Sequence, residues 1–88
     1  MMDSTKLCLF SYNSRGFSSL KQDFIRYLVK TAGNKVPIIC NQENFLLKSN
    51  SYLISQCLPN FNIIVKPSVK DSHDLGRPKN GMFIAIPN

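Results

Sequence analysis

Two polar side chains that could bind a metal ion follow two apolar runs of this 88-residue chain. Asn13 comes after the run at residues 7–10, and Glu43, the only glutamate, comes after the run at residues 36–40. Because the carboxyl ends of neighbouring parallel strands lie at one edge of a sheet, both side chains are expected at a shared edge. Mg²⁺ (or Mn²⁺) takes one or two carboxylate oxygens, several waters and substrate phosphate oxygens. The spacing therefore predicts a partial metal site, with a solvated loop glutamate as the alternative.

Short apolar runs predict the strands that would position these residues. The runs lie at residues 7–10, 36–40, 62–66 and 82–86. They are rich in β-branched or other apolar residues and are separated by polar, turn-forming segments. The first two strands enclose a helix, which favours a parallel crossover, and the last two are expected to form an antiparallel pair. The predicted order is β-α-β-α-β-β.

The first predicted helix begins at Ser19, which has capping-box spacing to Gln22. It ends at Gly33, a residue suited to a left-handed cap. Its apolar stripe consists of Leu20, Phe24, Tyr27 and Leu28, widened by Ile25 and Val29. A second, shorter helix is predicted over residues 53–58, because apolar residues recur there at helical spacing and Pro59 ends the pattern.

Strands that are apolar at consecutive positions are typical of sheets buried on both faces. Two short helices can cover only one face, so the other face needs a layer that these 88 residues do not contain. The chain is too short for two domains. We therefore expect residues 1–88 to be a truncated N-terminal half of one domain, whose partner is the missing C-terminal half.

Charge and cysteine content restrict the partners and the compartment. Eleven Lys and Arg against five Asp and Glu give a formal charge of +6, which attracts polyanions such as nucleic acid, although the basic residues are scattered. The three separated cysteines predict buried, reduced thiols, which favours an intracellular location, the nucleus included. No apolar run approaches the ~20 residues that span a bilayer, so no membrane association is expected.

Three segments in this order resemble one known family. They are residues 13–16 after the first strand, Gln42-Glu43 with an aromatic residue at Phe45, and residues 76–86, where Gly-Arg-Pro precedes the last strand. Together they resemble the N-terminal half of the endonuclease/exonuclease/phosphatase superfamily, in particular the apurinic-endonuclease-like domains of non-LTR retrotransposons. The resemblance covers about residues 7–86, and its weight comes from order and spacing rather than from any one motif.

The resemblance implies an α+β fold, the first half of a four-layer α/β/β/α sandwich, and an Mg²⁺-dependent endonuclease that acts on DNA. Glu43 would be the metal ligand, and Asn13 would position it as the second catalytic residue. Arg77 and Lys79 would contact the phosphate backbone, with solvated loop charges as the alternative. Asn80, counted with them as substrate-binding, replaces the first Gly of the family's pair, at a position that needs a positive φ.

The family's later Asp-x-Asn, further Asp and C-terminal Ser-Asp-His are absent, so the chain is expected to be inactive alone. His73 is interpreted as an ordinary loop histidine. Two alternatives stay open: a phosphatase or sphingomyelinase-like member of the same superfamily, and a non-enzymatic basic module or relic that binds nucleic acid. A doubly wound nucleotide-binding fold is disfavoured, because residues 13–16 contain one glycine only.

Overall fold

The computed structural model describes residues 3–69 and 80–88, which form a four-stranded mixed sheet with two α-helices. The elements along the chain are β1 (Asp3–Asn13), α1 (Ser19–Thr31), β2 (Lys35–Gln42), η1 (Lys48–Asn50), α2 (Tyr52–Cys57), β3 (Phe61–Lys66) and β4 (Met82–Pro87). η1 is a short 3-10 helix just before α2. The predicted order of strands and α-helices is confirmed, and η1 is an addition to it.

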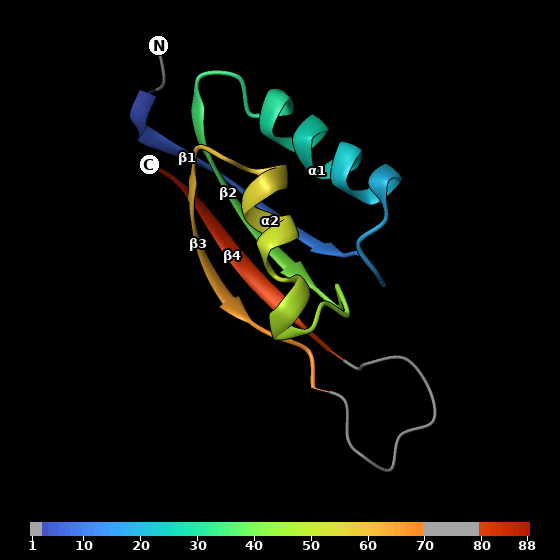
Figure 1. The fold of residues 1–88 in the computed structure, drawn as a ribbon. Coiled ribbons are helices and arrows are strands. Elements are labelled where there is room, and N and C mark those ends of the chain that lie inside the picture. Colours follow the sequence, from blue (N-terminus) through green and yellow to red (C-terminus); the bar gives the residue numbers. More distant parts are fainter. Residues whose placement is uncertain (1–2, 70–79) are drawn as a thin grey trace.

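The strands lie across the sheet in the order β1-β2-β4-β3, so the last strand in the chain is inserted between β2 and β3 (Figure 1). β1 and β2 are parallel, with Leu9 opposite Ile38. β4 is antiparallel to both neighbours, and its Ala85 lies opposite Ile39 and Ile63. The predicted parallel and antiparallel pairs are therefore confirmed. The insertion also brings the start of β4 beside the end of β2.

Both α-helices cover the same face of the sheet (Figure 1). The largest buried apolar side chains between the layers are Ile25 of α1, Ile54 of α2, Ile39 of β2 and Phe83 of β4. Burying an aliphatic or aromatic side chain of this size stabilises a fold by about 1.5–3 kcal/mol relative to leaving it exposed. The core is thus a single layer between the helices and one face of the sheet.

The opposite face of the sheet has no layer over it among the described residues. Alternate strand residues point there, and Leu9 and Ile64 keep 69% and 63% of their surface exposed. The other large apolar side chains on this face are Leu7, Met82, Ile84 and Ile86. Consecutive apolar residues in the strands therefore reflect two apolar faces, of which the helices cover one, as the sequence predicts.

The capping box expected at the start of α1 is absent. The helix begins at Ser19, as predicted, but its N-cap is Ser18, whose side chain makes no capping hydrogen bond. Gln22 donates its side-chain amide to the Phe17 carbonyl oxygen at 3.0 Å instead of reaching Ser19. Its backbone N–H already bonds the Ser18 carbonyl oxygen at 2.9 Å. The start of α1 is therefore held by hydrogen bonds that Gln22 donates to backbone carbonyl oxygens, and not by a serine hydroxyl.

The predicted apolar stripe of α1 is correct for Ile25 and Val29, which pack in or against the core, and wrong for Leu20 and Tyr27. Leu20 and Tyr27 are 79% and 61% exposed, whereas Ile25 is fully buried and faces the core. Phe24, 41% exposed, packs its ring on Tyr12 at 4.8 Å, so it covers the β1 edge of the sheet rather than the core. Within the described residues, neither α-helix has the length and apolar character needed to cross a membrane.

The three cysteines are free thiols, as predicted. Cys57 is buried, but Cys8 and Cys40 are only partly buried, so the expectation of three buried thiols is correct for one of them. Cys40 belongs to the uncovered face of the sheet, because it lies opposite Ile84 in the β2–β4 pairing. Cys40 is therefore partly exposed for the same reason as the apolar residues around it, because no layer among the described residues covers this face.

Candidate functional site

The carboxyl ends of β1 and β2 lie side by side. Asn13, the last residue of β1, is in register with Gln42, the last residue of β2, and Glu43 follows Gln42 directly. Asn13 and Glu43 are therefore at the same end of the sheet, on neighbouring strands. The shared edge that the sequence predicts is present, and the chemical roles of the two side chains stay predictions.

Glu43 is held in a left-handed backbone conformation, with a φ of 54°. For a non-glycine residue this costs about 1 kcal/mol, which the Gly16 N–H offsets by donating to the Glu43 carbonyl oxygen at 2.8 Å. The carboxylate lies 3.8 Å from the Arg15 guanidinium, and the two side chains are 41% and 81% exposed. A pair this exposed is weak, so a cation in solution can compete for the carboxylate.

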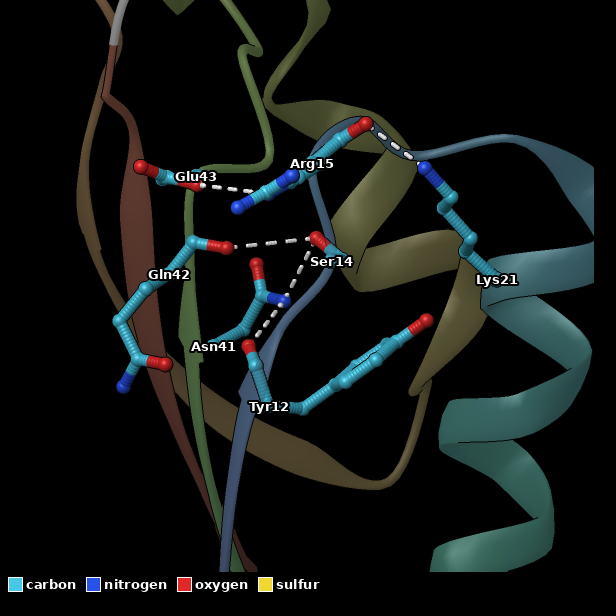
Figure 2. A network of polar contacts seen from close by, with 7 residues as sticks. All are labelled: Tyr12, Ser14, Arg15, Lys21, Asn41, Gln42 and Glu43. Carbon is cyan, nitrogen blue, oxygen red and sulfur yellow. Dashed lines mark hydrogen bonds and ion pairs between the residues drawn. The ribbon is translucent and has the colours of Figure 1, made fainter.

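Figure 2 shows the groups around this carboxylate. One Glu43 oxygen faces Arg15, and the other points away from it. Arg15 also has a positive φ of 48°, and its carbonyl oxygen accepts a hydrogen bond of 2.7 Å from Lys21 Nζ. The loop after β1 is thereby tied to α1 on one side and to the end of β2 on the other. Because only one Glu43 oxygen faces Arg15, the other carboxylate oxygen is available for a further ligand.

A hollow of about 260 Å³ opens beside Glu43. Its lining includes Gln42 and Glu43 at the end of β2, Lys66 and Val69 at and after the end of β3, and Asn80 and Met82 at the start of β4. Asn80 and Glu43, both predicted site residues, thus share one hollow. Asn13 does not line it. Arg77 and Lys79, the other predicted substrate-binding residues, lie outside the described residues.

The start of β4 is fixed against the loop after β2 by two backbone hydrogen bonds. The N–H groups of Asn44 and Phe45 donate to the carbonyl oxygens of Gly81 and Asn80 at 3.1 and 3.0 Å. Asn80 has a φ of 67°, so the positive φ expected at this position is confirmed. A Cβ on Gly81 would lie 2.5 Å from Asn44 Oδ1, so the two segments approach too closely for a side chain there.

A buried amide network supports the edge from behind. Asn41, fully buried in β2, donates to the Tyr12 carbonyl oxygen at 3.1 Å and to Ser14 Oγ at 2.9 Å (Figure 2). Its own oxygen accepts from Asn44 Nδ2 at 3.0 Å, and Asn44 Oδ1 accepts from the Leu46 N–H at 2.9 Å. No buried side-chain N or O atom among the described residues lacks a partner. The loops that carry Glu43 and Arg15 are therefore anchored to the core.

Sequence reasoning missed this network. The available signal was Asn41 itself, a polar residue inside an apolar strand, where a buried amide must find partners. Its partners could not be identified in advance, because Ser14 and Asn44 belong to loops whose conformations depend on the fold. Neither residue shows a pattern of its own in the sequence.

Glu43, the acidic residue at this edge, can form only part of a metal site. Among the described residues, no group of three or more His, Cys, Asp or Glu side chains is placed to hold a metal ion. A hard cation that keeps several waters needs only one or two protein carboxylates. Glu43, whose side chain is 41% exposed and which lines the same hollow as Asn80, fits one such ligand.

A second charged cluster lies on the helical layer. Arg26 pairs with Asp23 and donates to Cys57 Sγ at 3.6 Å. Burial raises the pKa of the Cys57 thiol, and the positive charge of Arg26 opposes that shift in part. The hydrogen bond that the Arg26 guanidinium donates to the Asp23 carboxylate is the main cause that raises the pKa of Arg26. Cys57 is therefore a protonated core thiol, and this cluster is structural.

Comparison with known protein families, with curated proteins and with solved structures found no match for this chain. Support for a function therefore comes from the residues at the end of the β1–β2 pair and from their geometry.

Proposed function

We propose that this chain contributes one half of an Mg²⁺-dependent phosphodiesterase that cleaves DNA, with Glu43 as a metal ligand. The observation that carries the proposal is the position of Glu43. It is an accessible carboxylate at the carboxyl end of a parallel strand, beside the end of β1 and on the rim of a hollow. Ligand sites in open α/β sheets gather at that end of the strands.

In this proposal, the described residues would bind the metal ion and orient a water or a phosphate oxygen. Glu43 would hold the ion, which neutralises charge on a phosphate and lowers the pKa of bound water when it is present. Asn13, at the end of the neighbouring strand, would orient a water or a phosphate oxygen through its amide. Hydrolysis also needs a base for the attacking water. No such group accompanies Glu43 in the described part of the chain, so the 88-residue chain is expected to bind metal without cleaving DNA.

The uncovered apolar face fits the finer fold that accompanies this function. In a four-layer α/β/β/α sandwich, a second sheet would pack on the face that carries Leu9, Ile64 and Ile84. Stacked sheets of this kind lie about 10 Å apart and bury such side chains on both inner faces. The second sheet would also bring the remaining catalytic groups to the same edge. The metal site is therefore proposed to be complete only when both halves are assembled.

A non-enzymatic basic module is the second candidate, and the net charge of +6 favours it. The two candidates differ in their dependence on Glu43. A module that holds DNA through scattered lysines and arginines binds equally well without Mg²⁺ and with Glu43→Ala. A phosphatase or a sphingomyelinase-like enzyme would keep the metal site and act on a different substrate. Nicking of plasmid by the assembled two-half domain would favour the nuclease over these two enzymes.

The test is a manganese titration of the isotopically labelled chain, followed by nuclear magnetic resonance. Substoichiometric Mn²⁺ is expected to broaden the amide signals of Asn13, Gln42 and Glu43 first, and Glu43→Gln is expected to abolish this selectivity. Asp23→Asn is the matched control, because Asp23 is also an exposed carboxylate paired with an arginine. Equal broadening around both carboxylates would refute the site. Mg²⁺-dependent nicking of plasmid by the 88-residue chain would contradict the expected inactivity.

A further inference from the structure

One row of side chains crosses the sheet at the edge that carries Glu43. Asn13 is in register with Gln42, Gln42 with Met82, and Met82 with Lys66. Residues paired in this way point to the same side of a sheet. Lys66 is thus on the uncovered face at the same end as Glu43. With strands about 4.8 Å apart, the Cα atoms of Lys66 and Gln42 are separated by roughly 10 Å.

The hollow of about 260 Å³ occupies the space between these two charges. Glu43 lines it from the end of β2 and Lys66 from the end of β3, on either side of β4, while Met82, Val69 and Pro67 give most of the lining an apolar character. Typical pockets for drug-sized ligands measure about 300–1,000 Å³, so this hollow suits a smaller unit. A phosphate ester with one attached sugar has the required combination of an anionic and a less polar part.

The Lys66 ammonium group can form an ion pair with the phosphate of such a ligand. The ion pairs among the described residues are Arg15 with Glu43 and Asp23 with Arg26, so no carboxylate in that part of the chain neutralises Lys66. Lysine binds phosphate as a mobile point charge. A metal ion at Glu43 and the Lys66 ammonium would then approach one phosphate from opposite sides.

We propose that Lys66 is a substrate-binding residue that holds the phosphodiester group of a nucleic-acid strand in this hollow, with the adjoining sugar against Met82. The role of Lys66 in cleavage rests on the proposed metal site at Glu43. Its role in binding needs only the register of the strands and the lining of the hollow.

The test measures how salt affects the binding of a fluorescein-labelled single-stranded oligonucleotide to the full 88-residue chain, by fluorescence anisotropy. Loss of one phosphate contact lowers the slope of log K against log salt by about 0.7, and weakens binding at 50 mM salt by roughly eightfold. Lys66→Gln is expected to show both changes. Lys30→Gln is the control, because Lys30 is an exposed lysine of α1, on the helical layer. Equal losses in the two variants would overturn the assignment.

A second measurement separates failure of this inference from failure of the metal site. The manganese titration is repeated on Lys66→Gln, which is expected to keep selective broadening at Glu43. If the broadening persists and the salt slope is unchanged, the assignment of Lys66 is overturned and the metal site stands. If the slope falls but the wild-type chain shows no broadening at Glu43, the phosphate contact is supported and the metal site is refuted. Inorganic phosphate at matched ionic strength is expected not to compete, and competition would refute the role of the sugar.

Discussion

Replacing Asn41 by alanine should destabilise the chain by about 3 kcal/mol. The Asn41 side chain makes three hydrogen bonds of 2.9–3.1 Å, to the Tyr12 carbonyl oxygen, Ser14 and Asn44. Each hydrogen bond contributes about 1 kcal/mol net, and the buried groups that bonded Asn41 would be left without a hydrogen-bond partner, which adds to the cost. A chain of 88 residues has a total stability of roughly 4–13 kcal/mol, so this loss is a large fraction of it.

The free energy of unfolding of wild type and Asn41→Ala can be compared by urea denaturation, followed by far-ultraviolet circular dichroism. Asn62→Ala serves as the matched control, because Asn62 is an exposed asparagine on β3 and its loss should change stability by less than about 0.5 kcal/mol. If Asn41→Ala costs less than about 1 kcal/mol, the amide network does not anchor the edge, and the reasoning is refuted.

Three further perturbations test the loops and the helical layer. Gly81→Ala should cost more than about 2 kcal/mol and Gly33→Ala about 1 kcal/mol in urea unfolding, since both have positive φ but only Gly81 lacks room for a Cβ; equal costs would contradict this. Arg15→Gln should change stability by under about 0.5 kcal/mol and tighten Mn²⁺ binding about threefold in a titration, by removing a neighbouring cation; unchanged affinity would argue against metal at this carboxylate. Burial raises the pKa of the Cys57 thiol in the folded chain, so the unfolded chain ionises first as pH rises above about 8.5, and the free energy of unfolding should fall there. Cys57→Ala should flatten the pH dependence of the free energy of unfolding by urea between pH 7.5 and 9.5. An unaltered profile would refute the shift.

Local pattern was sufficient to predict the strands and the helix positions. The apolar runs locate the strands, and Gly33 and Pro59 lie just after the ends of the two α-helices, but β1 extends from Asp3 to Asn13, beyond the run at residues 7–10. The face that α1 presents was not predictable in the same way. Leu20 and Tyr27 fit an apolar stripe as well as Ile25 does, and only the position of the sheet under the helix decides which of them is buried.

The candidate site was predictable in its placement and not in its support. Two polar residues after two parallel strands must reach one edge, and Asn13 and Glu43 do so. The insertion of β4 beside β2, which brings Asn80 and Lys66 near Glu43, depends on long-range pairing that no local pattern encodes. The positive φ of Glu43 and its contact with Arg15 follow from the same loop packing.

Anomalous diffraction from crystals soaked with Mn²⁺ tests the central claim most directly, because it locates the ion itself. The predicted result is an anomalous peak within coordination distance, about 2.0–2.2 Å, of a Glu43 carboxylate oxygen. The peak should vanish in crystals of Glu43→Gln. A peak at other carboxylates only, or one that persists in the variant, would contradict the assignment of Glu43 as a metal ligand.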